Sequence, residues 1–342
     1  MRSGTFAAVM LGLAAVLGSL LGSPLGPLPA SAEAQKIRIA HSYIAPVPAV
    51  LREKGFLDKA LAGRNVEVQW VTALGSNKAF EFLRGGSLDF ASSGGSAALV
   101  ARASGNPVKV LSFVQHGDII ALATLPTSGI KTPADLKGKK VAATPGTEPQ
   151  YFLLRALEQY GLTKDDIRLV PLIHPDGRVA LENGNVDAWA GLDPDLAKVE
   201  LQHGAVRFYR NPDILSGSVL VAREEFVKND PELTAIVLRA HEEARQWIIA
   251  HPDETVAIIA AGAKLTPEEA KRMFDRLDFA HPEIAKTDYQ KIGAYGDLLK
   301  KIGDLPASTD VNELLDQLLD PEPFQHATGA KATGTKTTGA KG

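Results

Sequence analysis

The stretch SLDFASSGGSAALVARASG (residues 87–105) joins a short apolar run to a helix-like run through three serines and two glycines. We expect a strand that ends near Phe90, a turn over the serines and glycines, and a helix that Gly105 closes. The first amides of a helix are unpaired and lie at the positive end of its dipole, and adjacent glycines let an anion approach them. The stretch therefore predicts part of an anion site. A glycine turn with Ser93 or Ser96 as a simple helix cap is the alternative.

The same order of strand and helix continues on both sides of this stretch. Runs that predict strands lie at residues 36–42, 66–71, 108–114, 119–125, 140–143, 167–173, 186–190, 205–210 and 217–223. Most of these runs are separated by segments that have helical spacing of apolar residues or helix-capping residues. Everything after Glu224 is predicted to be helical. The alternation predicts an α/β fold with a largely parallel sheet, built as two consecutive blocks with a helical C-terminal part. Ligands in such folds bind outside the C-terminal ends of the strands.

The two ends of the chain differ in composition from the rest. One positive charge at Arg2, an apolar stretch from Phe6 to about Leu21 and small residues before Ala32 predict a signal peptide at residues 1–32. Residues 325–342 consist mainly of alanine, threonine, glycine and lysine and predict a disordered tail. The chain has no cysteine, so it forms no disulfide and carries no lipid on a cysteine. We expect an exported, soluble protein.

Signatures of catalysis and metal binding are absent from the sequence. It contains no G-x-S-x-G, P-loop, G-x-G-x-x-G or H-E-x-x-H motif. The eight histidines are scattered, and His41, His116 and His174 at predicted strand ends are not at metal-ligand spacing. A net charge of −3 without clusters of basic and aromatic residues argues against nucleic-acid binding. We therefore predict no cofactor, no metal site and no nucleic-acid partner.

Three further loops combine a strand end or helix start with small donor residues: 75–76, 146–147 and 216–218. They come from both blocks, so their donors can converge on one cleft. Such convergence indicates capture of a small anion rather than catalysis. Glu148 is a counter-indication because it puts a carboxylate near the proposed site, although an acidic residue in a first helical turn is also favourable for the helix.

Four stretches resemble one protein family: LRGGSLDFASSGG (83–95), ADLKGKKVA (134–142), GTEPQYFLLRAL (146–157) and GNVDAWAGLDP (184–194). The chain resembles the periplasmic substrate-binding proteins of ABC importers for aliphatic sulfonates, with close relatives for taurine, sulfate esters and nitrate. The resemblance covers about residues 37–227. It implies a two-lobed Venus-flytrap fold of type II with two crossover strands. Lobe 1 would comprise residues 36–120 and 219–322, and lobe 2 residues 121–218.

The resemblance places an oxyanion site between the lobes, at Ser42, Tyr43, Gly75, Ser76, Ser93, Gly94, Gly146 and Thr147. The residue pattern adds further candidates: Gly95, His116, Gln150, Asp193, Ser216 and Ser218. Asp193 precedes a proline, so it either orients a loop or contacts the ligand. The sequence departs from the family at three places: at Gly95, where relatives usually carry an acidic residue; at 148–150 (EPQ), where they have a small or histidine-containing run; and at Leu192, where they have a nearby aromatic residue.

The resulting hypothesis is a monomeric periplasmic binding protein without catalytic activity. It would capture a small sulfonate or sulfate-ester anion between its lobes and deliver it to a membrane permease. One alternative is the same scaffold with nitrate, a thiamine-precursor pyrimidine, an aromatic carboxylate or another small organic anion. The other is an enzyme that resembles thiamine-pyrimidine synthases, against which the export signal and the lack of a histidine-rich or cysteine-bearing site argue.

Overall fold

The computed structural model describes residues 34–41 and 45–330. The predicted signal peptide, the candidates Ser42 and Tyr43, and tail residues 331–342 lie outside the described residues. From Gln35 onward the described chain folds as one compact unit that contains two β-sheets. No described helix is both long enough and apolar enough to span a membrane.

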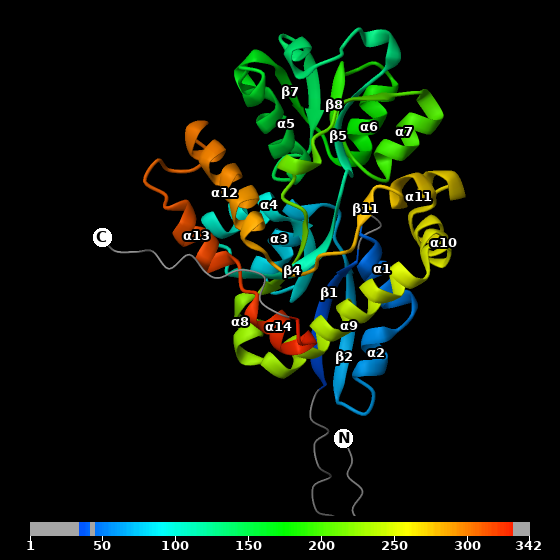
Figure 1. Cartoon of the computed structure of the whole chain (residues 1–342), viewed down its shortest axis with the longest axis vertical. Coiled ribbons are helices and arrows are strands. Elements are labelled where there is room, and N and C mark those ends of the chain that lie inside the picture. Colours follow the sequence, from blue (N-terminus) through cyan, green and yellow to red (C-terminus); the bar gives the residue numbers. More distant parts are fainter. Residues whose placement is uncertain (1–33, 42–44, 331–342) are drawn as a thin grey trace, which may run out of the picture. The chain divides into compact units, whose positions relative to one another are not determined.

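The first sheet has six strands in the order β11-β4-β10-β3-β1-β2 (Figure 1). Their bounds are β1 Gln35–His41, β2 Val66–Thr72, β3 Phe90–Gly94, β4 Val108–Gly117, β10 Ser218–Arg223 and β11 Leu277–Asp278. β1 runs parallel to β2 and β3, whereas β10 runs antiparallel to β3 and β4. The expectation of a largely parallel sheet is wrong here, because β10 enters the sheet at the end where β4 leaves it.

The second sheet has five strands in the order β7-β6-β8-β5-β9. Their bounds are β5 Ile120–Thr124, β6 Lys140–Ala143, β7 Arg168–Pro171, β8 Ala188–Leu192 and β9 Val206–Tyr209. β6 runs parallel to β7 and β8, and β5 runs antiparallel to β8 and β9. The chain passes between the sheets twice, once from β4 into β5 and once from β9 into β10.

Helices fill the segments between the strands and the C-terminal part (Figure 1). The α-helices are α1 Pro46–Glu53, α2 Phe56–Ala60, α3 Ser76–Arg84, α4 Gly95–Ala103, α5 Glu148–Gln159, α6 His174–Glu182, α7 Asp195–His203, α8 Glu224–Asn229, α9 Pro231–Ala250, α10 Pro252–Ala263, α11 Pro267–Phe274, α12 Lys286–Lys301, α13 Val311–Leu318 and α14 Glu322–Thr328. Short 3₁₀ helices lie at Pro126–Ser128, Pro133–Leu136, Lys164–Asp166 and Pro212–Ile214.

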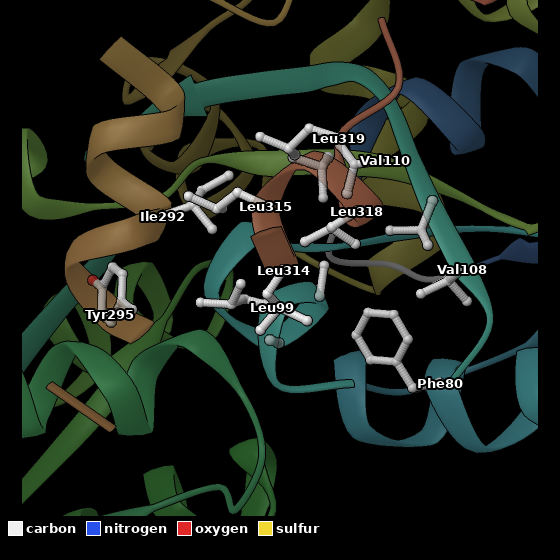
Figure 2. Close-up of a cluster of buried hydrophobic side chains, with 14 of the residues drawn as sticks. Phe80, Leu99, Val108, Val110, Ile292, Tyr295, Leu314, Leu315, Leu318 and Leu319 are labelled. Atoms are coloured by element: carbon white, nitrogen blue, oxygen red, sulfur yellow. The ribbon is translucent and has the colours of Figure 1, made fainter. Parts of the chain in front are cut away.

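Helices cover both faces of the first sheet. On one face, α1, α2, α9 and α14 bury a cluster that includes Ile37 of β1 and Leu220 of β10. On the other face, α3, α4, α12 and α13 pack together, and Figure 2 shows Leu99 of α4 beside Leu314 of α13, with Tyr295 of α12 at the edge of the same cluster. This packing fixes the start of α4, which lies at the border with the second sheet.

Two predictions about this stretch and the C-terminal part are wrong. The serines and glycines after Phe90 continue β3 rather than forming a turn, because Ser92 and Ser93 pair with residues of β10. The chain after Glu224 is not wholly helical, since β11 pairs with the end of β4. Both predictions fail because the segment pairs with a strand that is distant in the sequence.

The C-terminal helix α14 continues to Thr328, although the tail was predicted to begin at residue 325. Phe324 explains the difference: it is 3% exposed and packs in the cluster under α9, so it anchors the helix that follows it.

Two helical glycines differ in what surrounds them, and this gives a test of the packing around α6. A Cβ on Gly177 in α6 would lie 2.6 Å from Nε1 of the fully buried Trp189, whereas a Cβ on Gly262 in α10 would meet nothing within 4 Å. We expect Gly177→Ala to lower the free energy of unfolding by about 1–3 kcal/mol through overpacking. Gly262→Ala should raise it by about 0.5–1 kcal/mol, because alanine favours a helix over glycine. Urea denaturation measures both changes, and stabilisation by Gly177→Ala would contradict the packing described.

Candidate functional site

The first turns of α3 and α5 lie next to each other at one cavity between the two sheets. α3 follows Gly75 and α5 follows Thr147, and no side chain caps the first amides of either helix. A Cβ on Gly75 would lie 3.8 Å from Thr147 Cγ2, and a Cβ on Gly146 would lie 3.5 Å from Asn77 Cβ. The two glycines have φ values of +88° and +69°, a region that favours glycine. Two uncapped helix N-termini thus converge on one space.

The cavity between these helix starts has a volume of about 80 Å³. Six of the predicted candidates line it: Gly75, Ser76, Ser93, Gly94, Thr147 and Ser218. Apolar side chains such as Ile119, Ile120 and Leu192 complete much of the wall. No lysine or arginine among the described residues lines this cavity. An anion here would therefore be bound by amides and hydroxyls rather than by a basic side chain.

The N-terminus of α4 is closed to a ligand, because its first amides are bonded within the protein. Gly95 N–H donates to Gly217 O at 3.0 Å, and Ser96 N–H donates to Ser216 Oγ at 2.7 Å. Gly94 N–H donates to Ser76 Oγ at 3.2 Å. The amides that were expected to bind an anion at this helix start therefore join α4 to the segment that returns from the second sheet.

The carboxylate of Glu148 fills the space beside this helix start. Its Oε1 accepts a hydrogen bond from Ser216 N–H at 2.6 Å. A Cβ on Gly94 would lie 2.2 Å from Glu148 Oε2 and 2.7 Å from Glu148 Cβ, so the side chain packs directly on the glycine. Glu148 is 4% exposed, and hydrogen bonds from Ser216 and Gly95 are its described polar partners, without a cation among them.

The environment of Glu148 alters its acidity. Burial raises the pKa of Glu148 to about 7, while hydrogen bonds from Ser216 and Gly95 act in the opposite direction. Desolvation outweighs these donors, because a carboxylate taken out of water loses more than a few neutral hydrogen bonds return. The site therefore contains a carboxyl group that exchanges its proton near neutral pH.

His174, the first residue of α6, lines the same cavity. Burial lowers the pKa of His174 to about 4, so the imidazole is neutral at pH 7. Thr144 Oγ1 donates to Leu172 O at 2.9 Å and lies 3.0 Å from His174 Nδ1. Since the hydroxyl has a single hydrogen, both contacts are satisfied when Nδ1–H donates to Thr144. The other nitrogen, Nε2, is then an acceptor, and it lies 3.8 Å from the Cβ position at Gly75.

A second cavity, of about 510 Å³, adjoins the first. The two share Gln115, Ile119, Ile120, Glu148 and Ser218, so Glu148 stands at their border. Gln115 is 2% exposed, and its Oε1 has no hydrogen-bond partner among the described residues. The predicted candidate His116 lines this second cavity, where its ring stacks on Phe113 and its Nε2 lies 3.1 Å from His281 O.

Two other candidates organise loops. Gln150 Oε1 accepts a hydrogen bond from Gly146 N–H at 2.9 Å, which fixes the loop before α5. Asp193 accepts hydrogen bonds from Ala197 N–H at 3.0 Å and from Arg276 Nη1 at 3.0 Å to each carboxylate oxygen. It lines neither of the two cavities. This geometry matches the loop-orienting alternative for Asp193, which joins the loop after β8 to Arg276 in the segment that follows α11.

Gln115 and Glu148 line the cavity but were not among the predicted candidates. Gln115 carries a local signal, because it is an amide at the end of an otherwise apolar strand. For Glu148 the sequence indicates a carboxylate close to the site and a departure from the family at 148–150, but not its burial. Its position depends on contacts with Gly94 and Ser216, which are more than 50 residues away in the sequence.

The profile of the family described as "NMT1/THI5 like" matches residues 49–255 of the chain. The chain belongs to this family. Among curated proteins, the "Putative aliphatic sulfonates-binding protein" of Escherichia coli (strain K12) is 33% identical over 199 residues, which cover 57% of this chain and 61% of that protein. The protein of the same name from Bacillus subtilis (strain 168) is 29% identical over 223 residues, which cover 64% of this chain and 67% of that protein.

The fold is similar to that of solved periplasmic binding proteins. The crystal structure of the periplasmic aliphatic sulphonate binding protein SsuA from Escherichia coli matches with a TM-score of 0.72 and 24% sequence identity. The match covers 89% of this chain and 95% of that chain. The α/β fold of periplasmic binding proteins, predicted from the sequence, is thereby confirmed.

The contact between Gly94 and Glu148 can be tested by a double-mutant cycle. We expect Gly94→Ala to lower the free energy of unfolding by about 1–3 kcal/mol, because the added methyl overlaps the Glu148 side chain. In Gly94→Ala/Glu148→Gly the overlap is removed, so the coupling energy should be about 0.5–3 kcal/mol in favour of the double variant. Urea denaturation of the four proteins measures it. Additive effects would show that the two residues are not in contact.

Proposed function

We propose that the protein binds a small sulfonate or sulfate-ester anion in the cavity between the two sheets and passes it to a membrane permease. The observation that carries this proposal is the pair of helix N-termini, α3 and α5, that lie side by side at the cavity and whose N-cap residues make no side-chain cap hydrogen bond. Helix N-termini bind oxyanions through backbone amides and the helix dipole, without a basic side chain. The absence of a described lysine or arginine from the lining fits this mode of binding.

The oxyanion would take the first amides of α3 and, at the start of α5, those of Thr147 and Glu148, because Pro149 has no N–H and Gln150 N–H donates to Thr147 O at 3.1 Å. Ser76 Oγ accepts the Gly94 amide, so its own hydrogen is available for a ligand oxygen. Thr147 Oγ1 donates to Thr144 O at 2.7 Å, so this residue would offer its backbone rather than its hydroxyl. The volume of about 80 Å³ suits a small ligand. Ser93, Gly94 and Ser218 would add further small polar residues to the lining.

The family supports a transport role in which the ligand is carried unchanged. The curated relatives are named as binding proteins, and the solved neighbour is named as a periplasmic one. The predicted signal peptide at residues 1–32 supports export to the periplasm. A binding protein in that compartment needs a permease in the membrane to take up its ligand, and this partner belongs to the proposal.

The ligand class can be tested by calorimetric titration and thermal shift with methanesulfonate, methyl sulfate, nitrate and a 4-aminopyrimidine. Saturation with a ligand at about 100 times its Kd adds about 2.7 kcal/mol of stability. We expect the sulfonate or the sulfate ester to give the largest shift. A shift with nitrate or the pyrimidine alone would assign the scaffold to that ligand instead.

The position of the anion can be tested by adding a charge at the start of α3. Asn77 is the second residue of α3, and its side chain lies 3.0 Å from the Cβ position at Gly75. Asn77→Asp should weaken sulfonate binding at least tenfold, because the new carboxylate repels the anion. The fold should not suffer, because an acidic residue suits a helix N-terminus.

Asn312→Asp is the matched control, since Asn312 is likewise the second residue of a helix, α13, but no residue of that helix lines either cavity, whereas Ser76 and Ala79 of α3 line the first. We expect its affinity for the sulfonate to equal that of the wild type. An unchanged affinity in Asn77→Asp would show that the anion does not bind at the start of α3.

A further inference from the structure

The Glu148 carboxyl lies in the cavity that we propose for an anion, and this creates a conflict of charge. Glu148 is the first residue of α5, so its carboxyl and the anion compete for the positive end of the same helix. The cavity has no lysine or arginine among its described lining residues. An ionised Glu148 and a bound anion would therefore be two buried negative charges without a cation. Like charges at such a distance raise the affinity of a carboxylate for a proton.

The carboxyl of Glu148 is held in place on two sides, so it cannot relieve this conflict by leaving the cavity. Its Oε1 accepts Ser216 N–H at 2.6 Å, and Ser216 is itself 2% exposed and accepts the Ser96 amide through its Oγ at 2.7 Å. On the other side the carboxyl rests on Gly94, where an added Cβ would lie 2.2 Å from Oε2. The Ser216 amide can donate to the neutral acid as well as to the carboxylate. A second negative charge beside Glu148 is therefore met by a proton rather than by movement.

The ionisable groups on the neighbouring helices do not supply a compensating positive charge. On α6, burial lowers the pKa of His174 to about 4, so the imidazole is neutral. On α12, burial and then the charge of Glu148 raise the pKa of Tyr295 well above its usual value, so the phenol keeps its proton. Arg155 of α5 lies over the ring of Tyr295, with 5.4 Å between its Cζ and the ring centroid.

The second cavity, which Glu148 borders, is acidic. Its other charged or titratable lining residues are His116, Asp213, Asp278, His281, Glu283, Asp288 and Lys291. Four further carboxyl groups thus stand against one lysine, and this surplus of negative charge favours a proton on Glu148. Burial acts in the same direction and raises the pKa of Glu148 to about 7. Near neutral pH the carboxyl is therefore ionised in a large share of the molecules before an anion binds.

We propose that Glu148 is a proton-binding site coupled to the anion site, so that the protein holds its anion together with a proton on this carboxyl. The proton comes from water, adds to a Glu148 oxygen as the anion binds, and returns to water when the anion leaves. No other bond forms or breaks. Because the neutral form binds the anion, affinity is highest at low pH and falls as the pH rises through the pKa of this carboxyl. This inference rests on the proposed function, because it assigns a second ligand, the proton, to the same site.

The test is calorimetric titration of the full mature chain with methanesulfonate between pH 6 and pH 9, where the sulfonate itself stays ionised. The apparent Kd grows as the proton-bound fraction of Glu148 shrinks. We expect the wild-type Kd to be at least tenfold larger at pH 9 than at pH 6. At pH 8, titrations in Tris and in tricine, two buffers that differ in ionisation enthalpy and are not sulfonates, should show the uptake of about one proton per anion.

Glu148→Gln keeps the shape of the side chain and an acceptor for Ser216 N–H, but it cannot titrate. Its Kd should vary less than about twofold over the same pH range, without proton uptake. At pH 9 it should bind methanesulfonate at least tenfold more tightly than the wild type, a gain that a damaged fold would not produce. Glu269→Gln is the matched control, because Glu269 is also a buried glutamate in the first turn of a helix, α11, but lines neither cavity. It should keep the pH dependence of the wild type.

The outcomes separate this inference from the proposed function. A wild-type Kd that is the same at pH 6 and pH 9, without proton uptake, would overturn this inference and leave the proposed function standing. A pH dependence that persists in Glu148→Gln would assign the proton to another group and overturn it as well. If neither methanesulfonate nor methyl sulfate binds at any pH, the proposed function fails and this inference with it. If Glu148→Gln does not fold, the proton uptake of the wild type at pH 8 decides: about one proton supports the inference, and none overturns it.

Discussion

A carboxylate that is buried between two sheets must be surrounded by donors, and Glu148 meets this requirement by joining them. It starts the helix α5 that follows a strand of the second sheet, and its oxygen accepts the amide of Ser216 in the segment that returns to the first. Gly94 has to be a glycine for the side chain to fit. The serine–glycine end of β3 thus packs against the protein's own Glu148 carboxylate. The uncapped starts of α3 and α5 remain available to an external anion.

The helix starts offer amides and the Ser76 hydroxyl to an oxyanion, and the neutral His174 lies close to Gly75 at the same end of the cavity. Among the described residues that line the cavity there is no lysine or arginine, so affinity depends on how well the ligand's groups match fixed partners rather than on net charge. Asp193 lies outside the cavity, and its bidentate pair with Arg276 ties the loop after β8 to the segment that follows α11. Residues of the ligand site and residues that hold its loops are therefore distinct.

Local signals in the sequence predict much of this fold. Alternating apolar runs, glycines after helices and caps such as Thr266 act over a few residues, and they predict most strands and helix starts. The direction of β10 and the extension of β3 depend on pairing between segments more than 100 residues apart, which no local pattern encodes. The residues of the site likewise fall into those with a local sequence signal and those placed by long-range contacts. The loops at Gly75 and Thr147 have local signals, whereas the burial of Glu148 follows from the approach of three separate segments.

The acidity of Glu148 tests its burial most directly. An exposed glutamate titrates near pH 4.5, whereas burial raises the pKa of Glu148 to about 7. Between these values the native state keeps a proton that the unfolded chain releases, so this group lowers the free energy of unfolding as the pH rises. The measurement is an NMR titration of the ¹³C-labelled glutamate carboxyls, with the Glu148 signal assigned by its absence from Glu148→Gln. A midpoint close to pH 7 is the predicted result, and a midpoint close to pH 4.5 would contradict a carboxylate buried between the sheets.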